Sequence, residues 1–160
     1  MDSTELTVRL ATPGDAAEVI RLAALMYEAM GVDASDDRWR QAGSEALTHR
    51  LGLDAAVFVV DDPTGGGRLV ASGAGTIARR LPGPGNPDAG VGYIQWVSTD
   101  PGWRRHGLAR RITVSLLHWY EERGVPSIEL HATRDGEKLY RSLGFEEGPN
   151  PALRLRRKLP

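Results

Sequence analysis

A strand, a glycine-containing turn, a helix and a second strand follow one another over residues 92–132, and this order limits the fold more than any other feature. Residues 92–99 are strand-like, and residues 107–123 carry an apolar stripe at helical spacing. A new strand, residues 127–132, begins after Gly124-Val125-Pro126 breaks the helix. Strands joined by such a crossover helix run parallel in one sheet. The segment therefore predicts a sheet that contains a parallel strand pair.

The rest of the chain predicts further strands joined by short turns, together with three more helices. A short turn between neighbouring strands favours antiparallel pairing. The prediction is thus a single domain over residues 1–160 with an α/β fold of the mixed, α+β kind, in which a mostly antiparallel sheet has helices on both faces. We expect strands over residues 6–10, 55–60, 69–78 and 153–156, and helices over residues 12–31, 36–51 and 135–142.

Composition excludes several classes of function. The chain has 160 residues, no cysteine and a net charge of -1. It therefore has no disulfide or thiolate metal site, and its charge disfavours a protein that coats nucleic acid. No apolar run approaches the roughly 20 residues that span a bilayer, and residues 1–10 lack a signal-peptide core. We expect a cytoplasmic protein with no membrane or nucleic-acid partner. The histidines lack metal-ligand spacing, so no metal is expected.

The turn before the helix at residues 107–123 has the composition of an anion site. Backbone N–H groups at a helix start have no intrahelical partner, and the helix dipole adds positive charge there. Gly107 lets a ligand approach the backbone, while Arg104 and Arg105 supply lasting positive charge. The turn predicts a cradle for a pyrophosphate.

Two motifs make the chain resemble the GNAT superfamily of acyl-CoA-dependent N-acyltransferases. The matching residues are Arg104, Gly107 and Ala109 in the acyl-CoA signature, and Leu139, Tyr140, Gly144 and Phe145 in the later motif. The order of elements also matches over nearly the whole chain. The resemblance implies an N-acetyltransferase that uses acetyl-CoA and acetylates a primary amine on a small molecule or peptide. A homodimer is also implied, since dimers are frequent in this family.

The resemblance assigns roles by position. In the family, the strand before the turn splays from its neighbour, and the pantetheine arm pairs with the exposed edge. The backbone N–H of Val97 would stabilise the oxyanion, and Tyr140 would protonate the leaving thiolate, unless Tyr140 is only a structural aromatic residue. The cofactor-binding residues implied are Trp96, Val97, Ser98, Thr99, Arg104, Arg105, His106, Gly107, Leu108, Ala109 and Arg110.

The general base stays open at this point. Some family members carry a glutamate four residues before the oxyanion amide, where this chain has Tyr93, a poor base at neutral pH. Gln95 cannot take a proton. Glu129, His131 and a water relay remain as candidates, and His131 can equally be a hydrogen-bonded structural residue.

The acceptor is expected opposite the cofactor, along the first two helices and their loop. Acids beside aromatic residues can recognise a cationic amine, with a cation–π contact from tryptophan. The alternative is a solvated loop with a capped helix start. The candidate substrate residues are Tyr27, Met30, Asp33, Asp36, Asp37, Trp39 and His131.

Two other classes of function compete with an enzyme. The absent glutamate allows an acyl-CoA sensor or interaction module that does not catalyse. The arginine turn could instead contact nucleic acid, which the near-neutral charge disfavours. The basic residues of the C-terminal tail fit the charged face of an edge strand.

Overall fold

The computed structural model describes residues 5–160, and its centre is a five-stranded sheet in the order β1-β2-β3-β4-β5. The first four strands are antiparallel neighbours, whereas β4 and β5 run parallel. This confirms the predicted mixed sheet with one parallel pair. The strands are β1 (Val8–Leu10), β2 (Ala55–Asp61), β3 (Leu69–Arg79), β4 (Gly90–Thr99) and β5 (Ser127–Leu130).

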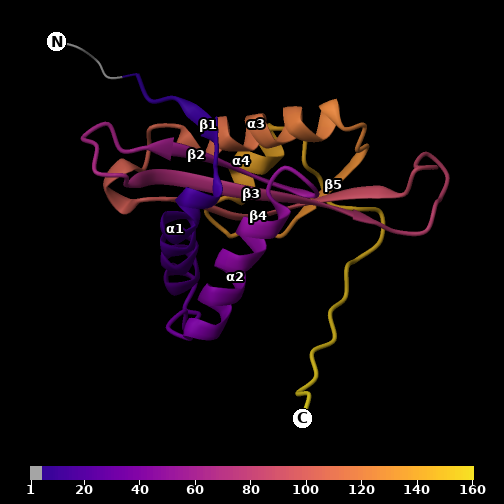
Figure 1. The fold of residues 1–160 in the computed structure, drawn as a ribbon. Coiled ribbons are helices and arrows are strands. Elements are labelled where there is room, and N and C mark those ends of the chain that lie inside the picture. The colour runs from indigo at the N-terminus through magenta and orange to yellow at the C-terminus, as the bar shows by residue number, and fades with distance from the viewer. Residues whose placement is uncertain (1–4) are drawn as a thin grey trace.

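Helices cover both faces of the sheet (Figure 1). One apolar core lies between the sheet and helices α1 and α2, and the other lies between the sheet and α3. The helices are α1 (Ala16–Ala29), α2 (Asp37–Arg50), α3 (Leu108–Glu122) and α4 (Glu137–Ser142), with short 3₁₀ helices η1 (Pro13–Asp15) and η2 (Pro101–Trp103).

Tyr120 holds α3 close to the sheet. Its side chain is fully buried, and its hydroxyl donates to the carbonyl oxygens of Tyr93 (2.9 Å) and Thr76 (3.1 Å) on neighbouring strands. Glycine beneath the ring makes this possible, because a Cβ at Gly92 would lie 2.5 Å from the ring and one at Gly75 would lie 2.6 Å from the hydroxyl. The helix that follows the arginine turn is therefore held firmly at its far end.

The prediction of a strand over residues 153–156 is wrong. These residues form no strand, and the whole segment 149–160 is exposed. The segment runs away from the sheet (Figure 1), and the side chains of Leu153 and Leu155 are 92% and 76% exposed. Alternating apolar and basic residues satisfy the pattern of a strand, but a strand also needs a neighbouring strand to pair with. Within residues 5–160, the segment pairs with none of the five strands of the sheet.

Candidate functional site

A bulge interrupts β4 at Trp96. The backbone of Trp96 has a φ of +58°, and the register of β3 and β4 shifts so that Gly73 alone faces both Trp96 and Val97. Two residues against one is the arrangement of a β-bulge, which bends a strand and redirects its side chains. Gly73 is required here because a Cβ at that position would lie 2.6 Å from Ile112 of α3. The bulge lies at Trp96 and Val97, two of the residues that the sequence analysis predicted to contact the cofactor.

Beyond the bulge, the two parallel strands have parted. Their pairing extends from Val91 with Ser127 to Ile94 with Leu130. The strand β5 ends there, while β4 continues to Thr99. On that side, the last part of β4 has no neighbouring strand within residues 5–160. An extended ligand can pair with such a backbone as an added strand does.

Four predicted cofactor-binding residues lie in this open part of β4. Trp96, Val97 and Thr99 are half-buried. Ser98 is buried, and its hydroxyl donates to the carbonyl oxygen of Leu22 in α1 (2.8 Å). The Ser98 side chain therefore holds α1 against the strand, which leaves its backbone as the part that can meet a ligand.

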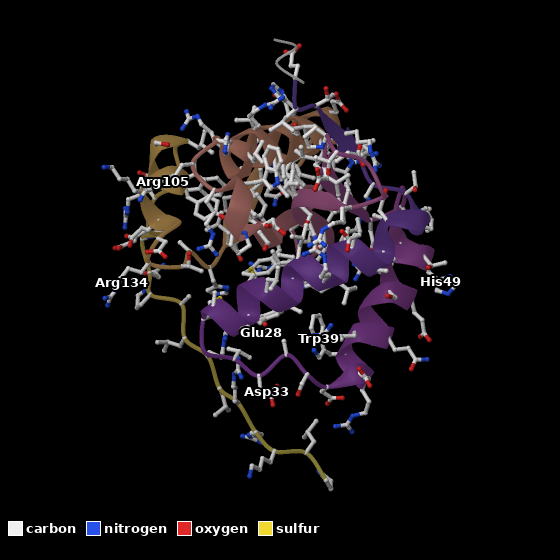
Figure 2. The ribbon with its side chains drawn as sticks, turned by 90° about the vertical axis from the view of Figure 1, so that its left-hand side faces the viewer. Glu28, Asp33, Trp39, His49, Arg105 and Arg134 are labelled. Atoms are coloured by element: carbon white, nitrogen blue, oxygen red, sulfur yellow. The ribbon has the colours of Figure 1, made fainter. Side chains whose placement is uncertain are left out.

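The arginine turn presents an open helix start. Arg105 and Gly107 both have left-handed backbones, with φ of +66° and +70°. A Cβ at Gly107 would meet nothing within 4 Å, and α3 begins after it without a side-chain cap. Arg104, Arg105 and His106 are exposed, and Figure 2 shows Arg105 at the surface. The free N–H groups, the helix dipole and the arginines together form a site for an anion.

Arg21 of α1 anchors the beginning of this turn. Its guanidinium donates to Glu18 (2.7 Å), to the carbonyl oxygen of Leu69 (2.9 Å) and to Asp100 (3.4 Å). Asp100 in turn accepts from the backbone N–H of Gly102 (3.1 Å) at the start of η2. The hydrogen bond from Arg21 lowers the pKa of the Glu18 carboxyl. Sequence reasoning missed this network, because Arg21 and Asp100 are 79 residues apart and neither belongs to a motif.

Helix α4 is tied to the first turn of α3. The guanidinium of Arg110 donates to the hydroxyl of Ser142 (2.8 Å), so the side chain of this predicted cofactor residue has a structural partner. Tyr140 is half-buried and packs edge to face on Phe145, with ring centroids 5.9 Å apart. Its hydroxyl makes no hydrogen bond to another residue of 5–160. Burial raises the pKa of Tyr140, so the phenol keeps its proton.

Three aromatic residues from separate elements meet on the opposite side of the sheet from α3. The ring centroids of Tyr27 and Trp39 are 5.6 Å apart, and those of Trp39 and Trp96 are 6.3 Å apart. The indole N–H of Trp96 donates to the hydroxyl of Tyr27 (3.2 Å). Two of the candidate substrate residues are thus in contact with the bulge of β4. We call Tyr27, Trp39 and Trp96 the aromatic cluster.

The acidic candidates lie outside the aromatic cluster, at or beside the loop between α1 and α2. Asp36 caps α2 by accepting from the backbone N–H of Arg38 (2.9 Å). Asp33 accepts from the backbone N–H of Ser35 (2.9 Å) and lies at the surface in Figure 2. A side-chain hydrogen bond from Ser35 and, second, its backbone N–H lower the pKa of Asp33, and the side chain and backbone of Arg38 lower that of Asp36 in the same order.

The remaining candidates of this segment are exposed. Asp37 lies in the first turn of α2, and Met30, which caps the end of α1, is 53% exposed. The capped helix start considered as an alternative is therefore present at Asp36. Asp33 and Asp37 have carboxylates that a cation could reach.

Tyr93 and His131 form a pair that the sequence did not predict. The Tyr93 hydroxyl lies 2.7 Å from Nδ1 of His131, across the end of the β4–β5 pairing. Burial raises the pKa of Tyr93. Glu129, the other candidate base on this strand, is held by Arg80 at 3.0 and 3.2 Å. Of the two candidate bases, His131 alone is free of an ion pair with another residue of 5–160.

Comparison with known proteins places this arrangement in a family. The model of the acetyltransferase (GNAT) domain matches residues 7–148. The chain belongs to the GNAT acetyltransferase family. This confirms the resemblance inferred from the arginine turn and the Tyr140 motif, and with it the enzyme class, an acyltransferase.

Individual proteins similar to this GNAT domain match different shares of the chain. Mycothiol acetyltransferase from Thermobifida fusca (strain YX) is 42% identical over 59 residues, which are 35% of this chain and 18% of that protein. The chain therefore matches less than a fifth of that relative's length. A predicted acetyltransferase from Clostridium acetobutylicum, solved with acetyl-CoA, has a TM-score of 0.84 at 20% identity, covering 95% of this chain and 96% of that one.

The name of a third similar protein states its acceptor. Glucosamine-6-phosphate N-acetyltransferase from Arabidopsis thaliana has a TM-score of 0.72 at 16% identity, covering 96% of this chain and 98% of that one. At these identities, the solved structures show that the fold is shared.

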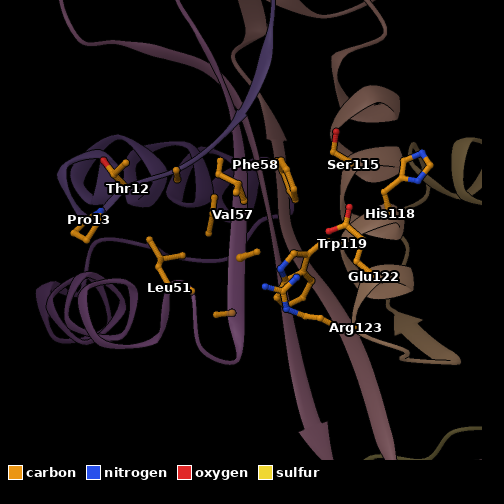
Figure 3. A pocket seen from close by; sticks show the side chains of 15 residues that line it. Thr12, Pro13, Leu51, Val57, Phe58, Ser115, His118, Trp119, Glu122 and Arg123 are labelled. Atoms are coloured by element: carbon orange, nitrogen blue, oxygen red, sulfur yellow. The ribbon is translucent and has the colours of Figure 1, made fainter.

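A hollow of 590 Å³ lies elsewhere on this GNAT domain, between β2, residues 10–13 at the start of η1, the residues that follow α2 and the second half of α3 (Figure 3). Leu51, Phe58 and Trp119 line it, and Arg123 stacks on the Trp119 ring at 4.6 Å. None of the arginine-turn residues lines it. Within residues 5–160, no helix is long and apolar enough to cross a membrane, and no cluster of acids and histidines is arranged to hold a metal.

Proposed function

We propose that this GNAT protein transfers an acetyl group from acetyl-CoA to a primary amine, which attacks the thioester directly. The observation that carries the proposal is the position of the parted β4–β5 pair directly before the uncapped start of α3. An extended thiol arm and a pyrophosphate need these two features side by side. The family membership supports acetyl-CoA as the donor.

In this proposal the donor is held mainly by backbone groups. The pantetheine arm pairs with β4 over Trp96, Val97, Ser98 and Thr99, and the N–H groups of residues 105–110 bind the pyrophosphate. The side chains of Arg104 and Arg105, both exposed, add positive charge.

The chemical step then needs three groups. The amine nitrogen bonds to the thioester carbon, the carbonyl oxygen takes up negative charge near the Val97 N–H, and the C–S bond breaks. Tyr140 gives its proton to the leaving thiolate; partial burial raises its pKa and keeps the hydroxyl protonated, which supports this role. His131 is our candidate to accept the amine proton, because Glu129 is occupied by Arg80.

The acceptor is proposed to be a small molecule or peptide that carries a cationic amine. The aromatic cluster forms one wall of the acceptor side and offers π faces to a cation. Asp33 and Asp37 supply negative charge nearby in the sequence, and neither carboxylate is paired with a basic side chain of residues 5–160. The glucosamine-6-phosphate relative supports a small-molecule amine acceptor.

A panel of amines, assayed with a thiol reagent that detects free CoA, tests the proposal. We expect CoA release above the hydrolysis background with at least one cationic amine, and lower kcat/KM for that amine in Asp33→Ala and Asp37→Ala. Tight acetyl-CoA binding without release of CoA for any amine would contradict catalysis and favour a sensor. If both aspartate variants match the wild type, the proposed recognition of a cation by these acids is wrong.

A further inference from the structure

The hollow in Figure 3 lies where β1 stops covering β2. The two strands pair only between residues 8–10 and residues 58–60, and after β1 the chain continues into η1. The uncovered start of β2 carries small side chains, Ala55 and Ala56, which leave room beside α3. The volume of 590 Å³ is within the range of about 300–1,000 Å³ that is usual for small-molecule sites.

The walls of the hollow are apolar. Leu51 closes it on the side of α2, and Phe58 and Trp119 line it on the side of β2 and α3. Trp119 belongs to the core beneath α3, and Phe58 packs against the same core, so both rings are held in place. Burial of a further apolar group against these rings is favourable. The hollow therefore suits a ligand with a large apolar group.

Two opposite charges lie at the opening of the hollow. Glu122 and Arg123 both line it, and both are exposed. The guanidinium carbon of Arg123 lies 4.6 Å from the centroid of the Trp119 ring. This stacking holds the guanidinium over the ring and leaves its N–H groups available to a carboxylate. Within residues 5–160, neither Glu122 nor Arg123 forms an ion pair.

A ligand with a single charge fits this opening poorly. A lone carboxylate that pairs with Arg123 would be repelled by Glu122, and a lone amine that pairs with Glu122 would be repelled by Arg123. A ligand with an ammonium and a carboxylate on one carbon satisfies both residues. His118 also lines the hollow, but its Nδ1 lies 3.8 Å from the Glu121 carboxylate and so already has an acidic neighbour.

We propose that this hollow binds a free α-amino acid with a large apolar side chain. The side chain of the ligand packs between Leu51, Phe58 and Trp119. Its carboxylate accepts from Arg123, and its ammonium donates to Glu122. A residue inside a peptide lacks both charges, so the opening selects the free amino acid. The lining contains no residue of the arginine turn or of the aromatic cluster, and the proposal does not depend on the acetyl transfer proposed above.

Titration calorimetry of the whole protein, without acetyl-CoA, gives the first test. L-Phenylalanine should bind one to one with a dissociation constant below about 1 mM. N-Acetylphenylalanine, which lacks the ammonium, and phenylalanine amide, which lacks the carboxylate, should each bind about tenfold more weakly. Alanine, which lacks the apolar group, should show no saturable binding at the same concentrations. No saturable binding of phenylalanine, or equal binding of any of the other three compounds, would overturn the proposal.

Variants at the opening identify the charged partners. Arg123→Gln and Glu122→Gln should each weaken phenylalanine binding about tenfold while the circular dichroism is unchanged. Arg111→Gln and Glu121→Gln are the matched controls, because both residues are exposed on α3 and neither lines the hollow. The controls should bind phenylalanine as the wild type does. If the variants at the opening bind as tightly as the controls, the assignment of the two charges is wrong.

Nuclear magnetic resonance locates the ligand. Phenylalanine should shift the indole N–H resonance of Trp119 and leave those of Trp39 and Trp96 unchanged, and saturating acetyl-CoA should not displace it. Shifts at Trp39 and Trp96 instead would place the amino acid in the proposed acceptor region, and displacement by acetyl-CoA would place it at the donor site. Either result overturns this proposal, whereas the panel of amines tests acetyl transfer separately.

Discussion

The indole N–H of Trp96 donates a 3.2 Å hydrogen bond to the hydroxyl of Tyr27, and this contact ties the bulge of β4 to helix α1. Trp96 has a left-handed backbone at +58°, which is unfavourable for a bulky residue, so the surrounding contacts must hold it in place. The same residue lies on the proposed pantetheine path. Its position therefore links the acceptor side of the molecule with the donor side.

Replacing Tyr27 by phenylalanine keeps the ring but removes the oxygen that accepts this bond. We expect a loss of about 1 kcal/mol in the free energy of unfolding, typical of one hydrogen bond, and weaker acetyl-CoA binding. A double-mutant cycle with Trp96→Phe, measured by urea unfolding, checks the contact. Strictly additive effects would show that the two residues are not coupled.

Tyr140→Phe should lower kcat by about 10²-fold or more, because the thiolate would leave without a general acid. The dissociation constant for acetyl-CoA, measured by calorimetry, should stay close to that of the wild type. Because burial raises the pKa of Tyr140, its hydroxyl should keep its proton to at least about pH 10, so kcat should show no loss from this group below that pH. An unchanged kcat in the variant would give Tyr140 a structural role only.

Gly107→Ala tests the arginine turn, and Gly124→Ala at the other end of α3 is its control. Both glycines have left-handed backbones, with φ of +70° and +66°, and a Cβ at either would meet nothing within 4 Å. Each substitution should cost about 1 kcal/mol of stability from backbone strain. Only Gly107→Ala should also weaken acetyl-CoA binding, measured by titration. Equal binding by both variants would argue against a pyrophosphate at Gly107.

Gly92→Ala should destabilise the fold far more than Gly83→Ala. A Cβ at Gly92 would lie 2.5 Å from the buried Tyr120 ring, whereas one at Gly83 would meet nothing within 4 Å. Overpacking of this kind costs about 1–3 kcal/mol, which thermal and urea unfolding can resolve. Similar unfolding midpoints for the two variants would mean that Tyr120 can move without a loss of stability.

The pH dependence of stability should depend on Glu18. The hydrogen bond from Arg21 lowers its pKa in the folded state, so this contribution is present above the unfolded pKa of about 4.3 and disappears as the pH falls through the folded value. Glu18→Gln should therefore flatten the loss of unfolding free energy below about pH 4.5. Glu28 is exposed on the same helix, so Glu28→Gln should keep the wild-type pH dependence of the free energy of unfolding. A wild-type acid profile in Glu18→Gln would refute the coupling.

The sequence predicted those features that depend on short stretches of chain. The arginine turn, its helix and the parallel pair could be inferred because glycine and helical spacing act locally. The contact between Tyr93 and His131 could not, since it depends on the register of two strands 38 residues apart. For residues 153–156, the sequence predicted a strand that the structure does not contain. A strand must pair with a second strand, and the pattern of residues within the segment carries no information about such a partner.

The parting of β4 and β5 has a consequence for specificity in assembly as well as for ligand binding. Most unpaired strand backbones are at the border of a sheet, where any extended protein segment can reach them. The open part of β4 instead lies inside the sheet order, between β3 and the line of β5. A ligand that pairs with this backbone takes the place of a single strand. In the proposed binding mode, the unpaired backbone that receives the slender cofactor thus lies within the sheet order and away from the sheet border, where other proteins would pair.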